Sequence, residues 1–131
     1  MSIVLMIVAA ALLVVLDLVW FYFAGSFFRS EISGIARLTD TGEWNVRYLP
    51  AALVYVLMSI GIVVFVYPLA SSVATAFAFG ALFGLLGYGL YDLTNLATLT
   101  DWTVRLAVID ILWGSFLCGT VSTMIFLVVR S

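Results

Sequence analysis

Four apolar segments, each long enough to cross a lipid bilayer, occupy most of the 131-residue chain. They cover about residues 3–28, 50–69, 73–99 and 104–129, with very few charged side chains inside them. A helix needs roughly 20 predominantly apolar residues to span the hydrocarbon core. Because 66% of the residues are hydrophobic and only 9% are charged, a soluble domain of this size could not bury so much apolar surface. The sequence therefore predicts an integral membrane protein.

The connections between the segments predict an all-α, polytopic bundle of four transmembrane helices in one domain, residues 1–131. Two connections, "YPLASS" and "TLTDW", are short, and short links make successive helices antiparallel neighbours in an up-down-up-down order. The connection over residues 29–49 is longer. Its first half places Phe28, Ile32, Ile35 and Leu38 at helical spacing, which favours a short helix in the membrane interface, with an exposed loop as the alternative.

The distribution of arginine predicts the orientation, since the chain contains no lysine. By the positive-inside rule, the two connections that carry most of the arginines lie in the cytoplasm, and both termini lie on the periplasmic or extracellular side. The arginines of those connections are Arg29, Arg37, Arg47 and Arg105, and Arg130 follows the last segment. Aromatic residues near the segment ends are typical of a belt at the membrane interface. They are Trp20, Trp44, Tyr48 and Trp102.

Missing residue types exclude several kinds of site. Without histidine the chain cannot form a bis-His haem site, a His-ligated metal site or a histidine proton relay, and without lysine it cannot form a Schiff base. The lone Cys118 fits a small packing residue in a helix. No Gly-rich phosphate loop or nucleophile elbow is present. We therefore expect no cofactor and no nucleic-acid partner, and the missing groups argue against catalysis by this chain alone.

Three carboxylates lie inside the predicted spans: Asp17, Asp92 and Asp110. Each costs about 2.5–3.5 kcal/mol to insert near a helix centre, so such residues usually face the bundle interior and are often functional. At about 1.5 Å per residue, they lie roughly 16, 10 and 9 Å from the cytoplasmic ends of their helices. Helical spacing predicts a polar patch around Asp92 that could bind a ligand, a proton or a cation. Its other members are Tyr88, Tyr91, Thr94 and Asn95.

These acids have few cationic partners. Arg105 is the only basic residue nearby; it is best placed for Asp101, four residues earlier, and could reach Asp92. At least one buried carboxyl is therefore expected to be protonated or held by neutral donors. An Asp-x-x-Trp pattern occurs in "VLDLVWF" and again in "VIDILWG", on helices expected to be antiparallel. We predict that the indole N–H of each pattern reaches the aspartate of the other, in the pairs Asp17–Trp113 and Asp110–Trp20.

Two strips of small residues predict close helix contacts, because small side chains let neighbouring backbones approach. They are Gly80, Gly84 and Gly87 in the third segment and Ser115, Gly119 and Ser122 in the fourth. The contacts could lie within the bundle or between subunits of a homo-oligomer. Membrane lipid is the other expected partner.

The stretches "YDLTNLATLTDW" and "VRLAVIDILWG", together with the Asp-x-x-Trp of the first segment and "WN" before the second, resemble one family. It is a family of small bacterial inner-membrane proteins known as a domain of unknown function (number 2177). The resemblance covers nearly the whole chain and implies a four-span protein of the bacterial inner membrane. It implies no activity, substrate or catalytic residue. Members often lie near genes for membrane-lipid modification and stress responses, which implies an accessory role as one alternative.

Three functions remain open at this point. The polar cluster could serve only to link helices, in a structural or accessory subunit. It could instead bind a proton, a hard cation or a small solute in a transport process, since its ligands are oxygens. Finally, Asp92 and Asp110 could act as an acid and base on a lipid, although the missing histidine, lysine and nucleophile argue against it.

Overall fold

A computed structural model describes residues 2–131 and contains four spans, each long and apolar enough to cross a membrane. The first is α1 (Ser2–Glu31), the third is α4 (Val73–Thr98) and the fourth is α5 (Val104–Arg130). The second runs through α2 (Tyr48–Gly61), a π-helical segment η1 (Ile62–Val66) and the short α3 (Tyr67–Leu69). Among the described residues the only bridge between extended segments is the isolated pair Leu38 and Trp44. The all-α, four-span prediction is confirmed.

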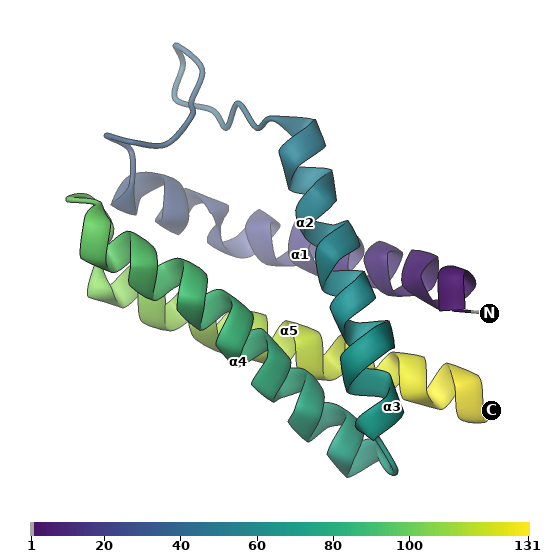
Figure 1. Ribbon diagram of the computed structural model, residues 1–131. Helices are drawn as coiled ribbons and strands as arrows, with labels where there is room; N and C mark the ends of the chain where they lie inside the picture. The colour runs from purple at the N-terminus through teal and green to yellow at the C-terminus, as the bar shows by residue number, and fades with distance from the viewer. Residues whose placement is uncertain (1) are drawn as a thin grey trace.

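The four spans form an asymmetric bundle (Figure 1). Successive spans run in opposite directions, so both chain ends lie at one end of the molecule, and the α1–α2 and α4–α5 connections lie at the other. The helices α4 and α5 lie side by side along their lengths, and α1 packs on α5. The first part of α2 contacts α1 and diverges from α4 and α5, which the second span meets through η1 and α3.

The π-helical turn joins the second span to the rest of the bundle. The N–H of Tyr67 donates to the carbonyl of Ile62, five residues back, which is the hydrogen-bond pattern of a π-helix. The buried side chains of η1 are Ile62, Val63 and Val66. Just before it, a side chain at Gly61 would overlap the ring of Phe83 on α4. The close contact with α4 is therefore made at this turn.

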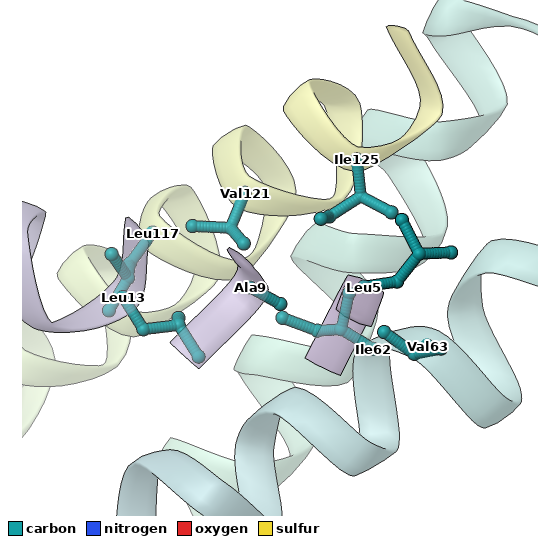
Figure 2. Close-up of a cluster of buried hydrophobic side chains, with 8 residues drawn as sticks. All are labelled: Leu5, Ala9, Leu13, Ile62, Val63, Leu117, Val121 and Ile125. Atoms are coloured by element: carbon teal, nitrogen blue, oxygen red, sulfur yellow. The ribbon is translucent and has the colours of Figure 1, made fainter. Parts of the chain in front are cut away.

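A wholly apolar core fills the end of the bundle near the chain termini (Figure 2). Its residues come from α1, η1 and α5: Leu5, Ala9, Leu13, Ile62, Val63, Leu117, Val121 and Ile125. On α1 and on α5 they recur every four residues, which places them on one face of each helix. This half of the bundle contains no buried carboxylate among the described residues.

Small residues make the contact between α4 and α5 close. A methyl group at Gly84 would overlap the backbone carbonyl of Gly114, and one at Gly80 would overlap Ser122. The hydroxyl of Ser115 donates to the carbonyl of Ala81 at 2.8 Å. The two predicted strips thus face each other within the chain. Gly87, which belongs to the same strip as Gly80 and Gly84, has open space around it. Contact with a second copy of the chain stays a prediction.

The predicted short helix between the first two spans is not formed. Instead α1 continues through Glu31, residues 32–36 form turns, and a bridge between Leu38 and Trp44 closes a tight turn at Gly42, whose φ is +84°. Gly34 lies so close to Asp101 that a Cβ there would overlap its carboxylate. The segment thus turns beside the α4–α5 connection instead of continuing as an amphipathic helix. The prediction was wrong for this reason.

Replacing Gly84 should separate α4 from α5. We expect Gly84→Val to destabilise the protein by about 1–3 kcal/mol, as overpacking of a close contact does. Gly87→Ala is the matched control; it places a methyl in open space and removes a helix-weakening glycine, so stability should be unchanged or higher by up to about 1 kcal/mol. Unfolding in mixed micelles with increasing sodium dodecyl sulfate measures both. Equal effects of the two variants would contradict this view of the contact.

Candidate functional site

Asp17 ties three spans together at one buried point. It follows Leu5, Ala9 and Leu13 on the same face of α1, and its side chain is buried. The hydroxyl of Tyr55 on α2 donates to one carboxylate oxygen at 2.5 Å, and the indole N–H of Trp113 on α5 donates to the other at 2.8 Å. Both oxygens are therefore satisfied by neutral donors. This is the arrangement by which polar side chains link helices in a membrane.

Only one of the two predicted reciprocal pairs is formed. The Asp17–Trp113 hydrogen bond is confirmed. The Asp110–Trp20 pair is not, because the ring of Trp20 stacks on that of Trp113, with centroids 4.6 Å apart and planes 5° from parallel. Its buried Nε1 has no hydrogen-bond partner among the described residues. The stacked ring fixes the orientation of Trp113 toward Asp17, and Tyr55 supplies the second donor.

A second acidic centre lies between α4 and α5. Asp92 is 0% exposed, and neither of its carboxylate oxygens has a hydrogen-bond partner among the described residues. The groups that approach it are the carboxyl of Asp110 on α5 and the indole of Trp102, which lies in the connection between the two helices. The indole N–H of Trp102 is also buried and without a partner. Donor and acceptors therefore face each other here without forming regular hydrogen bonds.

Other predicted site residues surround this centre unevenly. Tyr91 packs edge-on against Trp102, with ring centroids 5.7 Å apart, and its hydroxyl is close to Asn95. Tyr88 packs on Gly114 and lies near both Asp17 and Asp110, so it separates the two acidic centres. Thr94 is exposed on the outside of α4 and does not join either centre.

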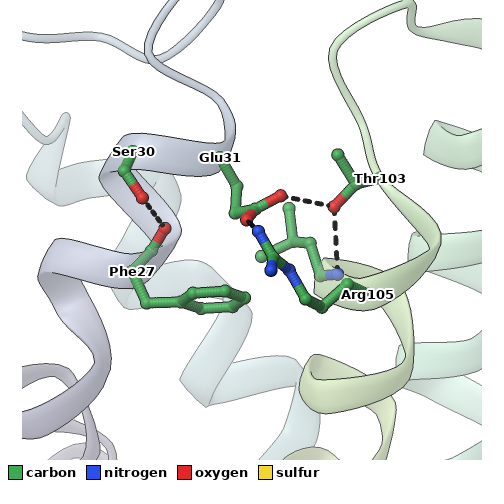
Figure 3. Close-up of polar contacts among 6 residues, drawn as sticks. Phe27, Ser30, Glu31, Thr103 and Arg105 are labelled. Atoms are coloured by element: carbon green, nitrogen blue, oxygen red, sulfur yellow. Dashed lines mark hydrogen bonds and ion pairs between the residues drawn. The ribbon is translucent and has the colours of Figure 1, made fainter.

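The one nearby cation is engaged elsewhere. Arg105 was expected to pair with Asp101 or Asp92, but its guanidinium forms an ion pair with Glu31 at the end of α1 (Figure 3). Glu31 also accepts a hydrogen bond of 2.7 Å from the hydroxyl of Thr103, which caps the start of α5. The expectation was wrong because α1 extends to Glu31 and brings a buried carboxylate beside Arg105. The remaining ion pair among residues 2–131, Arg29 with Glu43 at 3.9 Å, is also remote from the acids.

The two centres therefore differ in kind. Asp17 has one neutral donor for each oxygen, whereas Asp92 has none and has another carboxyl beside it. Leaving a buried acceptor without a partner costs about 1–3 kcal/mol, and more for a charged group. Two adjacent carboxyls without a cation avoid that cost by sharing one proton. The described residues contain no group of three or more His, Cys, Asp or Glu side chains arranged to hold a metal ion.

Two grooves on the surface of the bundle lie away from the Asp92–Asp110 centre, and the larger one reaches Tyr55, the partner of Asp17. A groove of about 430 Å³ runs between α1 and α2, and Tyr55 is the one polar residue of its lining. A smaller groove of about 160 Å³ lies between η1, α3 and α4 and is lined by apolar residues alone. Neither is lined by an aspartate. Neither groove therefore opens onto the Asp92–Asp110 centre.

Sequence reasoning missed three residues that define these centres. Tyr55 is one of three hydroxyl-bearing side chains within α2, with Tyr48 at its start and Ser59, and its position in an apolar stretch was a usable signal. Trp102 was assigned to an interfacial belt, but it is 8% exposed and turned into the bundle. Glu31 lies only three residues past the expected end of the first span, so its partner could not be inferred without the exact helix end.

Removing a donor to Asp17 should weaken the bundle. We expect Tyr55→Phe and Trp113→Phe each to lower the free energy of unfolding by about 0.6–1.7 kcal/mol, the range for hydrogen bonds between membrane helices. In Asp17→Asn the further loss from Tyr55→Phe should shrink, because the two side chains act together. Tyr22→Phe is the control, since Tyr22 is 83% exposed. Strictly additive losses would show that Tyr55 and Asp17 are not coupled.

Comparison with known proteins adds one finding to this geometry. A family model described as "Predicted membrane protein (DUF2177)" matches residues 2–127, a range that includes both acidic centres. No curated protein and no solved structure matches the chain. The matched range covers nearly all of the four membrane-spanning helices. This multi-pass membrane protein therefore belongs to the DUF2177 family of predicted membrane proteins.

Proposed function

We propose that this protein binds and releases a proton at the Asp92–Asp110 pair, as part of proton-linked transport of a small solute. The pair would lie in the cytoplasmic half of a bacterial inner membrane, with both chain termini on the periplasmic side. This orientation rests on the arginines of the α1–α2 and α4–α5 connections, which lie at the same end of the bundle.

One observation carries the proposal. Asp92 is fully buried and lies next to a second carboxyl, and among residues 2–131 its oxygens have no hydrogen-bond partner and no ion pair. A residue kept only to link helices would be hydrogen-bonded, as Asp17 is. Two buried carboxyls side by side are costly if both are charged, and binding of one proton between them removes a charge. Ionisable residues that face a bundle interior in this way often mark proton pathways.

The geometry favours a proton over a larger ligand. The pair contributes two carboxylates, fewer than the six to eight oxygens that a calcium ion takes. Asp92 of α4 is fully buried beside Asp110 of α5, and neither surface groove is lined by either aspartate. A proton needs no cavity.

The distribution of polar groups supports exchange with one side only. From the connections inward, the bundle contains Asp92, Asp110, Tyr88 and then Asp17, and beyond Asp17 the apolar core continues to the chain termini. In this conformation no continuous channel connects the acids to the side of the membrane where the chain termini lie. Transport would then require a second conformation, and the divergence of α2 above η1 supplies a helix that could move.

The hydrogen bonds of Asp17 favour a second candidate function, that of a structural or accessory subunit. Its complete set of neutral donors from two other spans is what a structural or accessory subunit would need to hold its helices in register. On this view the protein would support a membrane-lipid modification or stress response without binding anything at its acids. The unpartnered Asp92 is the observation that this alternative does not explain.

Infrared spectroscopy of the protein in lipid nanodiscs tests the proposal directly. A protonated buried carboxyl has a C=O stretching band that deprotonation removes. We expect this band to shift or disappear in both Asp92→Asn and Asp110→Asn, because each variant removes one of the two carboxyls that share the proton. In proteoliposomes we expect both variants to abolish proton entry driven by an imposed membrane potential.

The controls separate the pair from the other acids. Asp40→Asn changes an exposed aspartate in the α1–α2 connection and should leave the band and the proton entry unchanged. Loss of the band only in Asp17→Asn would assign the proton to the other centre and contradict the proposal. Proton entry equal to that of empty liposomes in the unmodified protein would contradict the transport part.

A further inference from the structure

We infer that Trp102 is a gate between the aqueous phase and the Asp92–Asp110 pair, and that the contacts of Glu31 with Thr103 and Arg105 hold this gate closed. The inference rests on the proposed proton site and concerns how a proton reaches it. It assigns a role to residues 99–103 and to the end of α1, none of which belongs to the acidic pair.

Trp102 occupies the position that a gate requires. The connection from Leu99 to Thr103 joins the ends of α4 and α5, and the two aspartates lie about two turns inside those ends. The Trp102 side chain turns back from the connection, is 8% exposed, and approaches Asp92. Its ring also packs edge-on against Tyr91. It therefore covers the pair on the side nearest to water.

Trp102 is held mainly by apolar packing. It shares a buried cluster with Phe28 of α1 and with Leu106 and Ala107 of α5, and its indole N–H forms no hydrogen bond. No directional bond within the described residues fixes this side chain to the bundle. Its position depends on the backbone of the connection, and thus on what holds that connection in place.

The contacts of Glu31 supply that restraint (Figure 3). Its carboxylate accepts from the hydroxyl of Thr103, the residue directly after Trp102, and pairs with the guanidinium of Arg105. The Glu31 side chain is 7% exposed, whereas that of Arg105 is 70% exposed. The Arg105 guanidinium also lies over the ring of Phe27, 5.4 Å from its centroid. Three contacts thus join the end of α1 to the start of α5 beside the gate.

The connection also lies beside the turn that follows α1. Gly34 approaches the exposed side chain of Asp101, the residue directly before Trp102, so that a Cβ at Gly34 would overlap its carboxylate. The residues on both sides of Trp102 thus lie against the end of α1 and the turn that follows it. Movement of the end of α1 would release the connection, turn Trp102 outward and open the pair to water.

Hydrogen exchange of the tryptophan indoles tests the gate in the whole protein. The chain has four tryptophans, so nuclear magnetic resonance in nanodiscs gives four indole N–H signals, which single Trp→Phe variants assign. In Glu31→Gln and in Arg105→Gln we expect the Trp102 indole to exchange about tenfold faster, because a charge-assisted contact that opposes local opening is lost. The Trp113 indole, bonded to Asp17 in the same spectrum, should be unchanged.

Matched variants make the result decisive. Glu43→Gln removes the other glutamate–arginine pair at this end of the molecule and should not change exchange at Trp102. Exchanging the charges in Glu31→Arg with Arg105→Glu should restore slow exchange. Unchanged exchange at Trp102 in both single variants would overturn the inference, and so would equal acceleration of all four indoles, which reports general loosening.

The two proposals fail separately. If the gate exists but the pair binds no proton, exchange at Trp102 will accelerate while the infrared band is absent. If the pair binds a proton without a gate, the band will be present and the rate of its loss after a pH jump will be the same in Glu31→Gln as in the unmodified protein. The gate predicts that this rate rises about as much as the indole exchange does.

Discussion

The lack of hydrogen-bonding partners in the hydrocarbon core is the constraint on which this structure depends. Within the bilayer every buried polar group must find its partner inside the chain, because lipid tails supply none. The chain meets this requirement at Asp17, where donors come from two other spans. It does not meet it at Asp92, where neither oxygen forms a regular hydrogen bond with any of the described residues. This contrast between two aspartates is why we propose a structural role for Asp17 and proton binding at Asp92.

Helical periodicity determines where the apolar core near the chain termini ends and the polar half of the bundle begins. On α1 the buried face runs through Leu5, Ala9 and Leu13 and reaches Asp17 at the next step of four. On α5 the corresponding face runs from Ile125 back to Leu117 and reaches Trp113 at its next step. Because the two helices are antiparallel, both faces become polar at the same level. The hydrogen bond between them follows from this coincidence.

Much of this arrangement can be predicted from the sequence, and the remainder has identifiable physical reasons. Four apolar segments and short connections predict the spans, and the Asp-x-x-Trp spacing predicts the Asp17–Trp113 bond. The same spacing does not predict that Trp20 stacks on Trp113, because stacking and hydrogen bonding compete for one ring and only the three-dimensional packing decides between them. The Tyr55 donor depends on how α2 crosses α1, which a π-helical turn sets. Helix ends predicted from sequence are uncertain by a turn, so the contacts of Glu31 with Thr103 and Arg105 could not be predicted.

The end of α1 shows how a charge outside the acidic pair can determine its chemistry. Arg105 is the cation placed by sequence nearest to Asp110, and a guanidinium beside two carboxylates would neutralise them without a proton. Glu31 instead binds this guanidinium, and Phe27 packs beneath it. The same glutamate therefore restrains the connection that carries Trp102 and withholds the cation that would compete with a proton. On the proposed function, Glu31 thus favours proton binding at Asp92 and Asp110 from outside the bundle. A further aspartate inside the bundle would instead need a hydrogen-bond donor of its own.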